Sequence, residues 1–172
     1  MSRTEKLDIT SLSWVLSDLR KNMRTIVLGL GNPILTDDGI GPRVVYELQK
    51  RVSDPDITLL EASLAGMDLM EMLVGYDRAV IIDVIRTGGK PGTIYRLTPD
   101  DLPQQRTDLT SEHQLGLLNA LQMGKELSQP MPGDISIIAV EAEDIHTFSE
   151  QMTPLVEQAL PTVMAMVLKE LK

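Results

Sequence analysis

Three side chains in this sequence could together hold a divalent metal ion: Asp38, Asp83 and His113. Two carboxylates and one imidazole bind a borderline divalent metal and leave coordination positions open for water or a further ligand. Cysteine is absent, which excludes disulfides, thiolate metal sites and a cysteine nucleophile. Such a site would bind free metal with modest affinity, so these residue types favour a metal that another molecule presents.

Asp37 and Asp38 are adjacent carboxylates between a predicted buried strand and a predicted helix. A carboxylate at a helix start can accept hydrogen bonds from free backbone amides and offset the helix dipole. Consecutive side chains point in different directions, so one of the two can cap the helix while the other faces a crevice. We assign the cap to Asp37 and the crevice to Asp38, with the reverse assignment left open.

Asp83 and His113 each lie where a predicted element meets a loop. Asp83 closes an apolar run at the expected carboxyl end of a central strand, where ligands bind in open α/β sheets. Its alternative role is to form the turn before residues 86–89. His113 lies at the junction of a polar loop and a helix. The only other histidine, His146, has no matching carboxylate motif around it and is predicted to be a surface or loop residue.

The elements that position these residues alternate between short apolar runs and helical patterns. This alternation is typical of βαβ units and a largely parallel sheet, and so of the α/β class. The run at residues 93–97 follows a turn and is expected to be an antiparallel edge strand, and residues 98–112 are expected to form a mobile polar loop. The predicted strands are residues 25–30, 57–60, 79–83, 93–97 and 135–140, and the predicted helices are residues 40–52, 66–73, 115–127 and the segment that begins at 153–154.

Composition favours one domain over residues 23–172, preceded by an extension of residues 1–22. The chain has 172 residues, of which 42% are hydrophobic, enough for a single core. The extension has apolar residues at helical spacing and is expected to form a short amphipathic helix that lies on the domain or, alternatively, docks a partner. The formal charge of −9 argues against nucleic acid or an anionic membrane as a partner. No membrane span or secretory leader is evident, so a cytoplasmic location is expected.

Well-known cofactor and hydrolase motifs are incomplete or absent. Residues 29–34 begin like the dinucleotide fingerprint G-x-G-x-x-G, but Ile34 stands where the third glycine should be. An organic cofactor is therefore not expected. The H-E-x-x-H pattern of zinc proteases and the G-x-S-x-G elbow of serine hydrolases are also missing.

Four motifs, taken in order, resemble those of the nickel-iron hydrogenase maturation endopeptidases. Residues 29–41 resemble the opening motif of that family, residues 65–69 and Asp83 resemble its middle motifs, and residues 113–117, with the sequence His-Gln-Leu-Gly-Leu, resemble a later one. The resemblance extends over residues 24–171 and leaves out the extension. The segment Val140–Glu143 departs from the proline-containing version that the family would lead us to expect.

The resemblance implies a three-layer α/β/α sandwich of the phosphorylase/hydrolase-like kind, with a twisted, mostly parallel sheet of about five strands. It further implies an endopeptidase that removes a short C-terminal extension from a hydrogenase large-subunit precursor after nickel insertion. By position, Asp38, Asp83 and His113 match the metal-contacting residues of the family. The nickel would be supplied by the precursor, which is the expected partner, and the chain is expected to be a monomer. A proton could be accepted by a neighbouring carboxylate such as Asp37.

Two other functions use some of the same features. A non-catalytic chaperone or adaptor could bind a partner's metal centre through the same three residues without cutting anything. Peptidyl-tRNA hydrolases also open with Gly-Leu-Gly-Asn-Pro, as residues 29–33 do here, but need a basic surface and a histidine soon afterwards. Here Asp37 and Asp38 follow instead and the net charge is −9, so this alternative is disfavoured.

Overall fold

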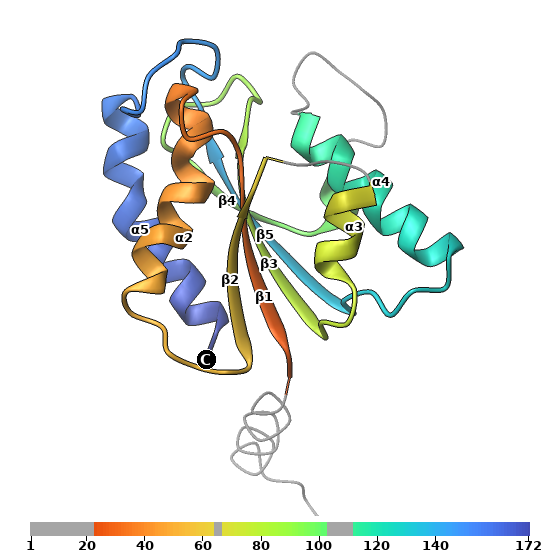
Figure 1. Cartoon of the computed structure of the whole chain (residues 1–172). Helices are drawn as coiled ribbons and strands as arrows, with labels where there is room; N and C mark the ends of the chain where they lie inside the picture. Colours follow the sequence, from red (N-terminus) through yellow and green to blue (C-terminus); the bar gives the residue numbers. More distant parts are fainter. Residues whose placement is uncertain (1–22, 64–66, 103–111) are drawn as a thin grey trace, which may run out of the picture.

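The apolar runs of the sequence form one twisted sheet in a computed structural model, which describes residues 23–63, 67–102 and 112–172 (Figure 1). Both the predicted extension, residues 1–22, and most of the predicted polar loop, at residues 103–111, lie outside the described residues. The strands are β1 (Thr25–Leu30), β2 (Ile57–Ala62), β3 (Arg78–Ile85), β4 (Ile94–Leu97) and β5 (Asp134–Glu141). The helices are α2 (Ile40–Gln49), α3 (Met67–Leu73), α4 (Glu112–Glu126) and α5 (Pro154–Glu170), with short 3-10 turns η1 (Thr36–Gly39) and η2 (Pro99–Asp101).

The sheet has the strand order β2-β1-β3-β5-β4. All neighbouring strands are parallel except β4, which pairs antiparallel with β5 at the edge. The predicted antiparallel edge strand is therefore confirmed. Along the chain, β1 is followed by β2 on one side and then by β3 on the other, so the strand order reverses between β1 and β3. Ligands of open α/β sheets bind at such a point, beyond the carboxyl ends of the strands.

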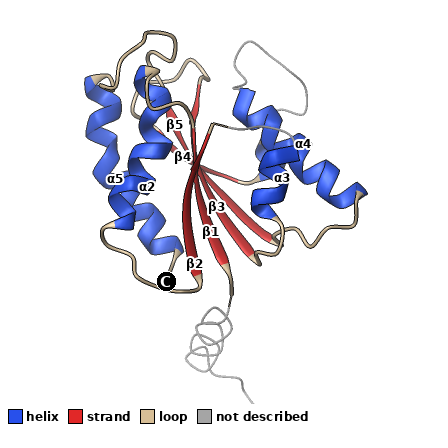
Figure 2. Cartoon of the chain, in the orientation of Figure 1, coloured by secondary structure: helices blue, strands red, loops and turns tan. Residues whose placement is uncertain are grey.

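In the described part of the chain, α2 and α5 cover one face of the sheet and α3 and α4 cover the other, so the predicted three-layer sandwich is confirmed (Figure 2). One core lies between the sheet and helices α2 and α5, and the other lies between the sheet and helices α3 and α4. Alternate residues of β3 divide between these cores: Ile82 and Val84 face α2 and α5, whereas Ile81 and Ile85 face α3 and α4. No helix within the described ranges is both long and apolar enough to cross a membrane.

Helix α2 approaches the sheet so closely that Gly41 has no room for a side chain. A Cβ atom at this position would lie 2.2 Å from the carbonyl oxygen of Leu30 and 2.9 Å from that of Ile82. Both obstacles are backbone atoms of central strands, which cannot move without disturbing the sheet. In the dinucleotide fingerprint the third glycine allows a helix to pack closely on a strand, and this chain has Ile34 at that position. Here Gly41 allows the close packing instead.

We predict that Gly41→Ala lowers the free energy of unfolding by about 3 kcal/mol, because overpacking against backbone commonly costs about 1–3 kcal/mol. Urea denaturation monitored by circular dichroism would measure the change. Gly133→Ala is the matched control, since a Cβ there meets nothing within 4 Å. Equal stability of the two variants would show that α2 can move away from the sheet at little cost.

Candidate functional site

Asp38 lies in a tight turn that follows β1. The turn begins at Gly31, whose φ of +134° favours glycine and whose Cβ would lie 1.9 Å from the carbonyl oxygen of Asp38. Asp38 itself is in η1, and its Oδ2 accepts a hydrogen bond from the backbone N–H of Asn32 at 2.7 Å. The side chain is buried.

Asp83 lies inside β3 and not at its end. The strand continues through Val84 to Ile85, so the prediction that Asp83 closes the run is wrong, and so is its alternative role in the following turn. Asp83 pairs in register with Ala139 of β5, and this pairing extends the strand past the polar residue. Because side chains alternate along a strand, Asp83 shares a face with Ile85, the face that α3 and α4 cover. Asp83 is almost completely buried, and its Oδ1 accepts the backbone N–H of Val84 at 2.8 Å.

His113 belongs to the first turn of α4, which starts three residues earlier than the predicted helix. Its Nδ1 lies 3.4 Å from Oδ1 of Asp83 and 3.7 Å from Oδ1 of Asp38. One potential ligand atom from each of the three residues lies within 4.8 Å of the others. The structure thus brings together Asp38, Asp83 and His113, from three separate elements, where the strand order reverses.

The charges at this site favour a cation. Burial raises the pKa of Asp38 above its ordinary value, and the nearby carboxylate of Asp83 adds to the rise. The imidazole of His113 and the hydrogen bond from Asn32 act in the opposite direction. A divalent ion between the two carboxylates would offset both the loss of hydration and their mutual repulsion.

Asp37 does not cap its own helix, so its predicted role is wrong. Neither η1 nor α2 has a side-chain cap, and Asp37 is fully buried and turned toward the segment that follows β5. Its Oδ2 accepts the backbone N–H groups of Glu143 and Asp144 at 2.8 and 2.9 Å, and its Oδ1 accepts that of Thr153 at 2.7 Å. The Thr153 hydroxyl donates a fourth hydrogen bond at 3.0 Å. A carboxylate with these four partners positions the site, which argues against the proton-accepting role considered for it.

Glu141, at the end of β5, is a positioning residue that the sequence did not single out. It is almost fully buried, and its Oε1 accepts the backbone N–H groups of Thr87, Gly88 and Gly89 at 2.7, 3.0 and 3.2 Å. Its Oε2 accepts the hydroxyl of Thr87 at 2.6 Å. The loop that leaves β3 after Ile85 is thereby tied to the neighbouring strand. The sequence did contain a signal for this role, a carboxylate at the end of an apolar strand. It lies in the segment Val140–Glu143, where the chain lacks the proline expected from the family.

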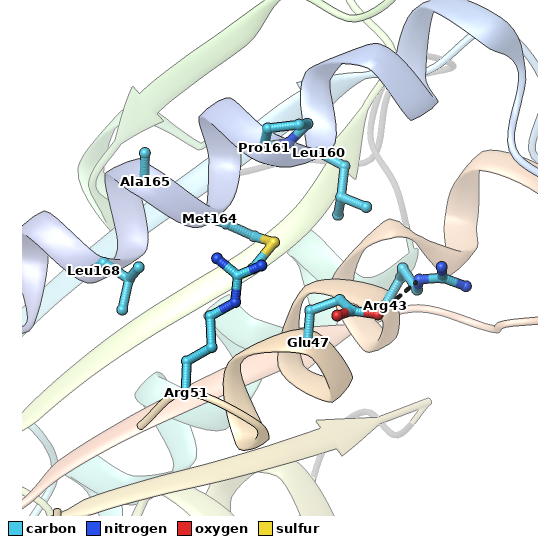
Figure 3. A pocket seen from close by; sticks show the side chains of 8 residues that line it. All are labelled: Arg43, Glu47, Arg51, Leu160, Pro161, Met164, Ala165 and Leu168. Carbon is cyan, nitrogen blue, oxygen red and sulfur yellow. Dashed lines mark ion pairs between the residues drawn. The ribbon is translucent and has the colours of Figure 1, made fainter. Parts of the chain in front are cut away.

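A groove lies between α2 and α5, away from the three clustered residues (Figure 3). This groove has a volume of about 300 Å³, and none of the three clustered residues lines it. On one side Glu47 forms ion pairs with Arg43 at 3.6 Å and with Lys50 at 3.0 Å. The α5 side is apolar. Because the groove lacks a cluster of ligand or nucleophilic side chains, the chemistry is better assigned to Asp38, Asp83 and His113.

Comparisons of the sequence find similarity to hydrogenase maturation proteases. The model of the hydrogenase maturation protease family matches residues 42–170, a range that contains Asp83 and His113. The hydrogenase 2 maturation protease of Escherichia coli strain K12 is 32% identical over 152 residues, which cover 87% of this chain and 92% of the relative. The hydrogenase expression/formation protein HupD of Bradyrhizobium diazoefficiens is 29% identical over 143 residues, which cover 81% of this chain and 74% of the relative.

Comparison of the folds gives the same kind of match. The hydrogenase maturating endopeptidase HybD from Escherichia coli superposes with a TM-score of 0.77 at 32% identity, over 87% of this chain and 92% of that one. The maturation protease HycI from Thermococcus kodakarensis superposes with a TM-score of 0.71 at 22% identity, over 91% and 98% of the two chains. At the lower identity the likeness is one of fold alone.

Proposed function

Since the chain belongs to the hydrogenase maturation protease family and is an endopeptidase, we propose that it removes the C-terminal extension of a nickel-iron hydrogenase large-subunit precursor. In this proposal the cut follows nickel insertion, and Asp38, Asp83 and His113 recognise the nickel that the precursor carries. The observation that supports it most is the convergence of their ligand atoms within 4.8 Å. Atoms bound to one ion at roughly 2.0–2.2 Å lie within about 4.4 Å of one another, so little movement is needed.

The three residues are proposed to recognise the substrate and to place the scissile bond in one event. Holding the precursor's metal brings the adjoining peptide bond to the carboxyl edge of the sheet, beside η1 and the start of α4. The positive charge of that metal can polarise the scissile carbonyl or make a water molecule more acidic. Hydrolysis adds this water across the bond, so that the carbonyl carbon gains the oxygen and the leaving amine gains a proton. Asp37 takes no part in the transfer, because its oxygens are engaged by four donors.

Mass spectrometry of the precursor's C-terminus tests the proposal. The nickel-loaded precursor is expected to be shortened by the unaltered protein and to stay full length with Asp83→Ala or His113→Ala, while the nickel-free precursor stays full length throughout. His146→Ala is the matched control, because it removes the chain's only other histidine, an exposed side chain beside Arg86. Cleavage of loaded and nickel-free precursor at equal rates would contradict metal recognition. Tight binding of the loaded precursor without cleavage would instead favour the adaptor function.

A further inference from the structure

Two large apolar side chains, Ile34 and Phe148, are exposed on two paired segments, one of which is the turn that carries Asp38. Their exposed fractions are 45% and 80%, and Phe148 is the chain's only phenylalanine. Leu35 and Ser149 form a parallel β-bridge, in which the N–H of Ser149 donates to the carbonyl of Ile34 at 3.0 Å. The bridge therefore brings the backbones of the residues that precede it, Ile34 and Phe148, side by side, and both side chains are exposed. We call these two residues the apolar pair.

The segment that carries Phe148 is held by hydrogen bonds on both sides of the aromatic residue. The hydroxyl of Thr36 donates to the carbonyl of Thr147 at 2.6 Å, and the N–H of Thr36 donates to the carbonyl of Ser149 at 2.9 Å. Oδ1 of Asp144 accepts the backbone N–H groups of His146 and Thr147 at 2.8 and 3.0 Å. An aromatic side chain on a segment fixed in this way loses less entropy on binding a partner than one on an unrestrained loop.

The same turn fixes the apolar pair relative to the metal-binding carboxylate. Thr36, which holds both neighbours of Phe148, precedes Asp38 by two residues. Its φ of +50° is unusual for a β-branched residue, and such backbone strain is maintained only where the surrounding contacts enforce it. Asn32 closes the turn by donating its N–H to Asp38 Oδ2 and by accepting the N–H of Ile34 at 3.2 Å. The carboxylate of Asp38 and the backbone of Ile34 are therefore held by the same residue, Asn32, in one fixed turn.

We propose that Ile34 and Phe148 form a hydrophobic contact for an apolar side chain of the precursor, close in sequence to the bond that is cut. This inference rests on the proposed function, because it assigns part of substrate recognition to a surface beside the proposed metal site. The pair touches neither the metal nor the scissile bond. Its loss is expected to weaken binding of the precursor and to leave the rate of the bound complex unchanged.

The test is steady-state processing of the nickel-loaded precursor by Phe148→Ser, with Phe148→Leu as the conservative variant. Phe148→Ser is expected to raise KM about tenfold or more, as removal of an aromatic anchor commonly does, with kcat within about twofold of the unaltered protein. Phe148→Leu is expected to restore most of the affinity. Leu127→Ser is the matched control, since Leu127 is 53% exposed just beyond the far end of α4, about 20 Å from His113 along the helix.

The outcomes separate this inference from the function on which it rests. If the unaltered protein does not shorten the loaded precursor, the proposed function and the inference both fail. If it does, and Phe148→Ser has an unchanged KM, only the inference fails. An unchanged KM with a large fall in kcat would also overturn it, as would an equal rise in KM for Leu127→Ser. Thermal melts that match those of the unaltered protein would show that each exposed substitution leaves the fold intact.

Discussion

Asp38→Asn is expected to reduce processing of the nickel-loaded precursor at least about 100-fold while leaving the fold as stable as before or more so. Loss of a residue that only supports a metal ligand already costs about 10–100-fold in metal affinity or activity, and a neutral amide in place of a ligating carboxylate should cost at least as much. The amide oxygen can still accept the N–H of Asn32, which Oδ2 of Asp38 now accepts at 2.7 Å. Activity is measured as the fraction of precursor shortened with time.

The stability half of this prediction follows from the raised pKa of Asp38, which results mainly from burial. A carboxyl group whose pKa is higher in the folded than in the unfolded chain stabilises the fold below the unfolded value of about 3.9, and this contribution is lost as the pH rises through the folded value. At pH 7 the ionised Asp38 therefore opposes folding. Asp38→Asn removes this penalty, so its melting temperature at pH 7 should equal or exceed that of the unaltered protein, with a smaller gain below pH 4.

Thermal melts at the two pH values check the sign of the effect. A clearly lower melting temperature for Asp38→Asn at pH 7 would contradict the prediction, because Asp38 would then be a structural acceptor. Normal processing by the same variant would show that the carboxylate is not needed to hold the precursor's metal. Asp54→Asn is a suitable control, since Asp54 is exposed and its Oδ1 accepts a local N–H, that of Asp56 at 2.9 Å.

The fold could be predicted because the residue patterns that specify it are local. Apolar runs and helical spacing identified every described strand and helix to within a few residues, including the antiparallel β4. The end of β3 was missed because a polar residue in an apolar run resembles a boundary. Pairing with β5 continues the strand through Val84 and Ile85, and such pairing is a tertiary contact that no short window contains.

The site could be predicted in part for the same reason. Asp38 follows β1, His113 lies in the first turn of α4, and Asp83 lies two residues before the end of β3. Parallel topology brings such positions together at one edge of the sheet. The roles of Asp37 and Glu141 could not be read from local patterns. A helix cap is a contact within one turn, whereas Asp37 accepts hydrogen bonds from residues 106 to 116 positions away and Glu141 from residues 52 to 54 positions away. Long-range hydrogen bonds of this kind leave no periodic signal in the sequence.

Asp37→Ala is expected to lower the free energy of unfolding by about 3–5 kcal/mol, whereas Asp38→Asn is expected to leave it unchanged or raise it. Removing one partner from a buried network that contains a charge commonly costs that much, because the remaining donors lose their acceptor away from water. The backbone amides of Glu143, Asp144 and Thr153 would all be affected. Urea denaturation would measure the loss. Asp37→Asn should lower the free energy of unfolding by less, because its amide keeps one oxygen that accepts hydrogen bonds. Some loss remains, since the N–H₂ group would face backbone donors.

The consequence for processing should be indirect, because Asp37 ties the segment that carries Phe148 to the turn that carries Asp38. Hydrogen exchange of the Glu143 and Asp144 amides should speed up in Asp37→Ala at temperatures where the protein remains folded. Unchanged exchange and unchanged stability would mean that other contacts suffice to hold this segment. If processing were lost while stability and exchange stayed normal, Asp37 would have to act on the substrate itself. Asp37 and Asp38 would then both act on the substrate. Burial and four hydrogen-bond donors would not distinguish a carboxylate that supports the fold from one that binds the substrate.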